Sequence, residues 1–153
     1  METVETHVDC EAAADWFDAK RRQVMLRIDG AFADTLRDAY NFMRGNPGFH
    51  SRTGKLSASM FWQHIPGTGT SKGWLGAKAS YALWVEESTK PHWITGKNGG
   101  LLHFYSAKAG NWITCRKVWH PGTTGRQFVE RAAYRADMWL PNRCAEAVEK
   151  ALS

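Results

Sequence analysis

Two adjacent carboxylates, Glu86 and Glu87, are the only acids between Asp38 and Glu130, although this segment contains eleven Lys or Arg residues. Isolation in a basic, aromatic segment indicates a role in ion pairing, in catalysis or in contact with a partner. If the segment is a strand, the two neighbouring side chains point to opposite faces. They then cannot face each other as the acid and base of a hydrolase.

Large aromatic side chains accompany these acids. The chain has eight Trp residues, and four of them lie near the two acids in sequence: Trp84, Trp93, Trp112 and Trp119. Surface Trp with carboxylates would suit a protein that binds or hydrolyses cell-wall glycans, and this is the alternative function that the sequence leaves open. Trp more often anchors cores and interfaces. We therefore predict no enzymatic activity and no catalytic residue.

Metal and cofactor chemistry finds little support in the sequence. No two His residues are two or four positions apart, and the Cys residues form no CxxC pair, so no local ligand set is present. We predict no metal, no cofactor, no disulfide framework and histidines that lie on the surface or have ordinary partners. The residues concerned are His7, His50, His64, His92, His103, His120, Cys10, Cys115 and Cys144.

Binding of phosphate or nucleic acid is a further possibility that the composition raises, because the net charge is +5. The Gly-rich segment 67–73 lacks the Gly-Lys-Ser/Thr order of a phosphate-binding loop. Basic residues alternate with aromatic ones, but no RNP, KH or recognition-helix signature is present. We expect a hairpin loop at 67–73 and no sequence-specific binding of nucleic acid.

The charge is distributed unevenly along the chain. Residues 1–18 contain six acids and no Lys or Arg, so the remaining residues carry a net charge of +11. A length of 153 residues fits a single domain spanning residues 1–153. Acids follow Met1 where a signal peptide would have basic residues, and no apolar run approaches the ~20 residues of a membrane span. We therefore expect a soluble protein made in the cytoplasm.

Two helices are predicted to position these residues. Apolar residues recur every three or four positions from about Asp9, a possible cap, to Arg44, and the turn at 45–48 ends this helix. Gly30 indicates either a break into two helices or one helix that protrudes from the domain. A second helix is predicted from Arg126 to Leu152, with Pro141 bending or restarting it.

The strands are expected between the helices, at residues 61–65, 74–80, 101–105 and 112–119. The tight turn at 97–100 and the small residues at 106–111 suit hairpins. The order helix, strands, helix predicts an α+β fold with a long N-terminal helix, a small antiparallel sheet or half-barrel, and a C-terminal helix packed on the sheet. A strand-to-helix turn is expected at His120, Pro121, Gly122 and Thr123.

Several short motifs, in this order, resemble a family of tailed bacteriophages: the minor tail, tail-completion or neck proteins that join head to tail. The resemblance covers roughly residues 50–135, with Glu87 and Ser88 standing where the family usually has an aromatic residue and Gly. The matching residues are Thr53, Gly54, Lys55, Leu56, Ala58 and Ser59, then Tyr81, Ala82, Val85, Glu86, Thr89 and His92, then Leu102 and Phe104, then Val118, His120, Pro121, Gly122 and Thr123, and finally Gly125, Arg126, Phe128 and Ala132.

The resemblance implies a structural virion protein without catalysis, made in the cytoplasm of the host bacterium. Such a subunit forms a ring, commonly of six copies, in the neck or at the top of the tail. It contacts neighbouring neck or tail proteins, and DNA passes through the ring without being read. No membrane is involved.

A ring of this kind needs two different surfaces on each subunit that meet in neighbouring copies. We expect acids at the centre of the chain and in its N-terminal segment to meet basic residues of a neighbour, with exposed aromatic residues as anchors. Residues 1–20 are predicted to dock on an adjacent subunit or a neighbouring protein. The candidate interface residues are Trp16, Phe17, Trp84, Glu86, Glu87, Arg116, Lys117 and Arg126.

Overall fold

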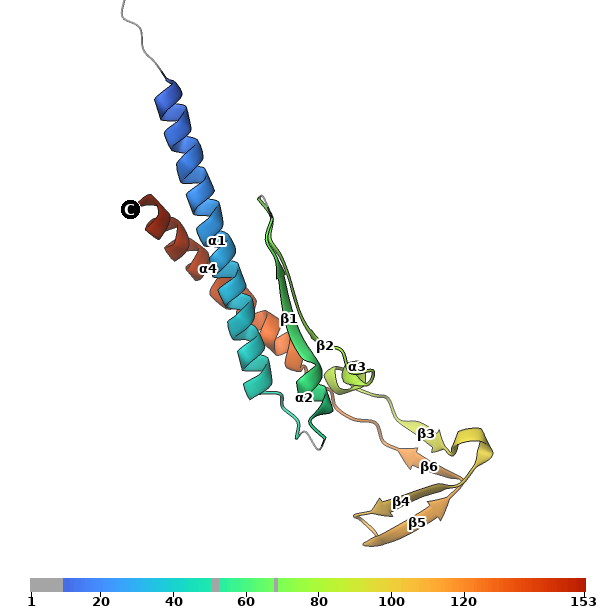
Figure 1. Cartoon of the computed structure of the whole chain (residues 1–153). Coiled ribbons are helices and arrows are strands. Elements are labelled where there is room, and N and C mark those ends of the chain that lie inside the picture. Colours follow the sequence, from blue (N-terminus) through green and yellow to red (C-terminus); the bar gives the residue numbers. More distant parts are fainter. Residues whose placement is uncertain (1–9, 51–52, 68) are drawn as a thin grey trace, which may run out of the picture. The chain divides into compact units, whose positions relative to one another are not determined.

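The structure is a computed structural model that describes residues 10–50, 53–67 and 69–153 (Figure 1). Where the sequence predicts one domain, the internal contacts of the chain gather into two compact units. Unit 1 comprises Met1–Ala79 and Phe128–Ser153, and unit 2 comprises Ser80–Gln127. The predicted Asp9 cap lies outside the described residues. In the structure Cys10 precedes the first helix.

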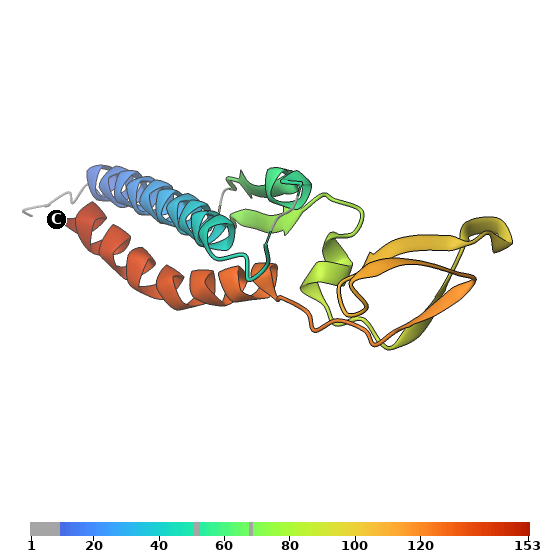
Figure 2. The ribbon, with the colours of Figure 1, turned by 90° about the horizontal axis from the view of Figure 1, so that it is seen from below.

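Unit 1 is built on two long helices, α1 (Glu11–Gly45) and α4 (Phe128–Leu152). They pack side by side in both views of the molecule (Figures 1 and 2). They are antiparallel, because Lys20 Nζ donates to the Ala151 carbonyl at 3.1 Å near one end, while Arg131 donates to the Asn46 carbonyl at 2.8 Å near the other.

Both helices continue through the residues at which a break was possible. Gly30 lies inside α1, which is a single helix, so the alternative of two helices broken near Gly30 is wrong. A Cβ at Gly30 would meet nothing within 4 Å, so no close packing requires a glycine there. Pro141 lies inside α4 and does not end it. Packing along α1 outweighs these two unfavourable local residues.

A hairpin and a short helix complete unit 1. The strands β1 (Met60–Ile65) and β2 (Lys72–Ala77) are antiparallel, with Met60 opposite Ala77, and α2 (Lys55–Ser59) precedes them. The hairpin lies against α1 so closely that a Cβ at Gly73 would be 2.2 Å from Leu36 Cδ1. A larger residue at position 73 would therefore require the Leu36 side chain to move.

Unit 2 contains a short helix, α3 (Ala82–Glu86), a 3-10 turn, η1 (Lys97–Gly99), and two hairpin-like ribbons. The strands are β3 (His92–Thr95), β4 (Leu102–Ser106), β5 (Asn111–Cys115) and β6 (Lys117–His120), and β3 pairs with β6 while β4 pairs with β5. The single strand predicted at 112–119 is wrong, because the chain changes its partner strand at Arg116.

The α+β class and the long N-terminal helix are confirmed. The strands form three two-stranded sheets, and α4 packs mainly along α1. Every buried side chain among the described residues belongs to unit 1. These are Thr35, Leu36, Ala39, Met43, Leu56, Met60, Phe128, Ala132, Ala147 and Ala151. Four of the ten are Ala, which lets the elements of unit 1 approach closely.

Candidate functional site

The two stretches that the sequence singles out lie against each other in unit 2. The amide of Arg126 donates to the Val85 carbonyl at 2.8 Å, and the amide of Gln127 donates to the Glu86 carbonyl at 3.1 Å. Thr89 and Thr123 exchange two backbone hydrogen bonds of 2.9 and 3.2 Å. We call this set of contacts the clamp: residues 85–89 against 122–127.

Two glycines make the clamp possible. Gly122 has φ +85°, and a Cβ there would lie 2.2 Å from the Thr89 carbonyl oxygen. At Gly125 a Cβ would be 2.4 Å from the Glu86 carbonyl oxygen. Any other residue would push the two segments apart, since real Cβ atoms do not approach this closely. Gly122 of the predicted turn, together with Gly125, therefore allows the two distant segments to come into contact.

The acids Glu86 and Glu87 are not on a strand, so the argument from opposite strand faces does not apply to them. Glu86 is the last residue of α3 and is half-buried, whereas Glu87 follows the helix in an extended conformation and is exposed. The carbonyl groups at the end of α3 are occupied by the amides of Arg126 and Gln127, which come from a distant part of the sequence. These tertiary contacts favour a helix in an apolar run that periodicity alone leaves ambiguous. The predicted ion pair of Glu86 with a Lys or Arg stays a prediction.

The predicted turn at 120–123 is stabilised by its own histidine. The Gly122 amide donates to His120 Nδ1 at 3.1 Å, which requires this nitrogen to be unprotonated. His120 lies opposite His92 on the paired strands, with 5.2 Å between ring centroids. His92 Nδ1 lies 2.8 Å from the Lys90 carbonyl, to which it can donate. Each imidazole therefore has a partner from its own turn.

The clamp borders a pocket of about 730 Å³ within unit 2. Its wall includes the exposed indole of Trp84, the paired rings of His92 and His120, and the ammonium-bearing side chain of Lys90. No carboxylate lines it; the remaining lining residues are Tyr81, Val85, Ser88, Thr89 and Thr123. An aromatic, weakly basic concavity of this kind suits an aromatic side chain or an acidic segment.

The two ribbons of unit 2 each display an aromatic pair on an exposed face. Trp93 lies opposite Trp119 with ring centroids 5.2 Å apart, and Lys117 Nζ lies 4.8 Å from the centre of the Trp93 ring. Tyr105 lies opposite Trp112, and both are exposed. Of the predicted basic interface residues, Arg116, Lys117 and Arg126 are all exposed.

The predicted N-terminal anchors lie in unit 1. Trp16 and Phe17 are 55% and 66% exposed, and their rings touch edge to face at 5.0 Å. Every residue from Cys10 to Ala19 is exposed. We call Glu11–Ala19 the overhang, because α4 reaches α1 only as far as the Lys20–Ala151 hydrogen bond. Residues 1–9 of the predicted arm lie outside the described residues.

The sequence reading missed one polar cluster, in unit 1. Asp29 of α1 accepts a hydrogen bond from Ser71 and lies 2.9 Å from His64 Nε2. The residue types are those of a catalytic triad, but Asp29 stands between the other two, so the histidine cannot activate the serine. The cluster attaches the hairpin to α1. No sequence motif reveals it, because Asp29 is more than thirty residues from both His64 and Ser71.

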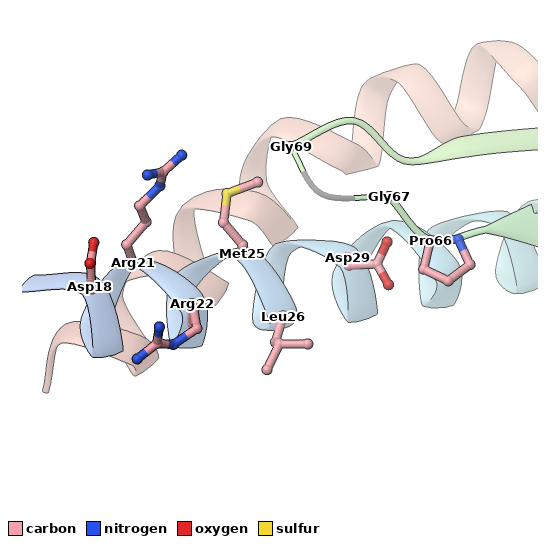
Figure 3. A pocket seen from close by; sticks show the side chains of 9 residues that line it. All are labelled: Asp18, Arg21, Arg22, Met25, Leu26, Asp29, Pro66, Gly67 and Gly69. Atoms are coloured by element: carbon pink, nitrogen blue, oxygen red, sulfur yellow. The ribbon is translucent and has the colours of Figure 1, made fainter. Parts of the chain in front are cut away.

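An open pocket of about 650 Å³ lies next to this cluster (Figure 3). Arg21 and Met25 point away from Arg22 and Leu26, so the charged groups do not converge on one point. We infer no ligand site from this arrangement.

Among residues 10–50, 53–67 and 69–153, no three His, Cys, Asp or Glu side chains come together as metal ligands would. In the same part of the chain, no helix is long and apolar enough to cross a membrane.

Neither a protein-family model, nor a curated protein, nor a solved structure matches this chain.

Proposed function

We propose that the chain is a structural subunit of a tailed-bacteriophage virion, which assembles into a ring in the neck or at the top of the tail and helps to join head and tail. Sixfold symmetry, neighbouring neck and tail proteins as partners, and passage of DNA through the ring belong to this proposal. They rest on the motifs between residues 50 and 135. The subunit acts by assembly and has no catalytic residue.

The observation that supports assembly is the large amount of exposed apolar surface. Six of the eight Trp residues are exposed, and the large exposed apolar side chains outnumber the buried apolar ones among the described residues. Large exposed apolar surfaces mark interaction sites, and Trp is enriched among the residues that dominate interface energies. The exposed aromatic residues occur in both units, as a subunit with two different interfaces requires.

The glycan-hydrolase alternative receives less support from the structure. Glu86 and Glu87 are adjacent at the end of α3, and neither lines the pocket beside Trp84. A glycosidase needs two carboxyl groups on either side of the bond to be cleaved. No such arrangement is found at these two acids.

The proposal is tested by infecting cells with a phage in which an early stop codon interrupts the gene for this chain. We expect electron microscopy to show separate filled heads and tails that fail to join, and expression of the wild-type chain from a plasmid to restore joined particles. Normal virions without the protein would contradict the proposal. Lysis or glycan cleavage by the purified chain would support the hydrolase alternative instead.

A further inference from the structure

The face of α1 that packs on α4 continues into the overhang. Trp16 and Phe17 precede Lys20 by four and three positions, so they lie on the same side of the helix as Lys20. Lys20 contacts the last turn of α4 through the Ala151 carbonyl. Beyond this point α1 presents an aromatic pair that no described residue covers.

The charges of the overhang lie on its other side. Glu11, Asp15 and Asp18 follow one another at intervals of four and three residues, which places them on one stripe roughly opposite Trp16 and Phe17. A partner that covers the aromatic pair therefore leaves these carboxylates in water. Hydrated charges of this kind steer the approach of a basic partner more than they hold the complex.

Unit 2 provides a surface of the complementary kind. From Lys90 to Arg126 the chain has six Lys or Arg residues and no acid. The pocket beside the clamp has aromatic walls from Tyr81 and Trp84 and the basic side chain of Lys90. Trp84 is 66% exposed, so its indole is available to a partner.

The overhang and the attachment of unit 2 lie at opposite ends of α1. Unit 2 is joined to unit 1 through Ala79 and Phe128, and Phe128 packs on Phe49, just after α1 ends, with ring centroids 5.5 Å apart. Trp16 precedes the end of α1 by some thirty residues, which is about 45 Å along the helix axis.

We propose that the Trp16–Phe17 pair of one copy seats in the pocket lined by Tyr81, Trp84, Lys90, His92 and His120 of a second copy. This inference rests on the proposed ring and specifies its contact. The interface is head-to-tail, because the aromatic pair of each copy meets the pocket of the next. Such an interface closes into a ring when the rotation that relates one copy to the next is a whole fraction of a full turn.

The test uses the full-length chain in two complementary forms. The first carries Trp16→Ala and Phe17→Ala, and the second carries Trp84→Ala and Lys90→Glu. The matched controls are Leu26→Ala, an exposed apolar residue on another face of α1, and Trp112→Ala with Lys108→Glu, an exposed Trp and Lys of the β4–β5 ribbon. Mass photometry and sedimentation velocity report the assembly state of each.

We expect the wild type and both controls to form closed oligomers. Each test variant alone should stay monomeric, with the dissociation constant raised about 100-fold or more, since central aromatic anchors dominate interface energies. An equimolar mixture of the two test variants should form one-to-one pairs and nothing larger, because only one intact interface remains. Far-ultraviolet circular dichroism should be unchanged throughout.

The inference would be overturned if the wild type stayed monomeric, or if the test variants assembled as the wild type does. It would also be overturned if the mixture formed no pairs, or if the monomer with Trp16→Ala and Phe17→Ala had a lower midpoint of thermal unfolding than the controls. A lowered midpoint would mean that Trp16 and Phe17 stabilise the fold of a single chain. Binding of a single-stranded oligonucleotide that Trp84→Ala abolishes would assign the pocket to nucleic acid instead. One-to-one pairing with normal virions from the interrupted gene would leave this contact standing and reject the phage role.

Discussion

The two units of this chain are held together by different means. Unit 1 contains all the buried side chains of the described residues, between two long helices and a hairpin. Unit 2 contains no fully buried side chain, and its segments are joined by the backbone hydrogen bonds of the clamp and of the β3–β6 and β4–β5 strand pairs. A unit without a core of its own has little hydrophobic stabilisation to draw on. Most of its large aromatic side chains are exposed.

This difference predicts that the same kind of substitution has different consequences in the two units. Changes in unit 1 should affect global stability by removing buried apolar surface. Changes in unit 2 should act through backbone geometry and should be seen locally.

The largest effect is expected from Phe128→Ala in unit 1. Phe128 is 1% exposed and contacts Phe49, so the substitution leaves a cavity in the core. We expect the free energy of unfolding to fall by about 3–5 kcal/mol. Chemical denaturation in the background of Trp16→Ala and Phe17→Ala, which we expect to be monomeric, measures this. Tyr134→Ala on the exposed side of α4 is the control, with a change within about 0.5 kcal/mol. A loss below about 1 kcal/mol would show that the core of unit 1 does not depend on this side chain.

The next effect concerns the clamp. Gly122→Ala forces a Cβ toward the Thr89 carbonyl and strains a positive φ, so we expect a cost of about 2–4 kcal/mol confined to unit 2. Hydrogen exchange should accelerate at residues 85–89 and 122–127 and stay unchanged in α1 and α4.

The matched control for this substitution is Gly99→Ala. Gly99 also has a positive φ, of +76°, but a Cβ there would meet nothing within 4 Å. We expect a cost of about 1–2 kcal/mol from the backbone conformation alone. Equal effects of the two substitutions, or faster exchange throughout unit 1, would refute the clamp as the device that holds unit 2 together.

A smaller effect is expected at the two acids. Glu86 is half-buried beside the clamp, and we predict that it pairs with a Lys or Arg. Glu86→Gln should therefore cost about 1–3 kcal/mol in unit 2, between the values for exposed and buried pairs. Glu87→Gln is the control and should leave the hydrogen exchange of unit 2 unchanged, because Glu87 is exposed. Equal behaviour of the two variants would remove the case for an ion pair at Glu86.

Much of unit 1 could be predicted from the sequence. The apolar periodicity predicts the first helix at Asp9–Arg44, and the structure has Glu11–Gly45. The second helix is predicted at Arg126–Leu152, and the structure has Phe128–Leu152. Such patterns are reliable because the buried face of a long helix repeats many times. At Gly30 and Pro141 the sequence leaves a break in the helix open, and the structure shows a continuous helix at both residues, since packing between helices outweighs single unfavourable residues.

Unit 2 was harder to predict because its structure depends on contacts between distant residues. The helix α3 is not predicted from the sequence, since a short apolar run has no decisive period. The run at 112–119 became two strands because β5 and β6 pair with different partners. Both sides of the clamp belong to stretches whose composition stands out in the sequence, but only the structure shows that these stretches contact each other. The pairing of Asp29 with His64 and Ser71 was equally invisible.

The smallest effect is expected where the two helices of unit 1 are joined by charges. Arg143 of α4 donates to Asp38 of α1 at 2.7 Å, and the two side chains are 33% and 39% exposed. This ion pair lies in an open surface pocket that other charged side chains also line, so water and counter-ions screen it. Asp38→Ala and Arg143→Ala in a double-mutant cycle should give a coupling of about 0.2–1 kcal/mol that decreases in 1 M salt. The more exposed pair Arg37–Asp34 is the control and should show less coupling still. A salt-independent coupling above about 3 kcal/mol would mean that the helix pair relies on a desolvated ion pair as well as on its apolar core. Polar contacts would then stabilise both units, and the two units would differ only in how much they depend on them.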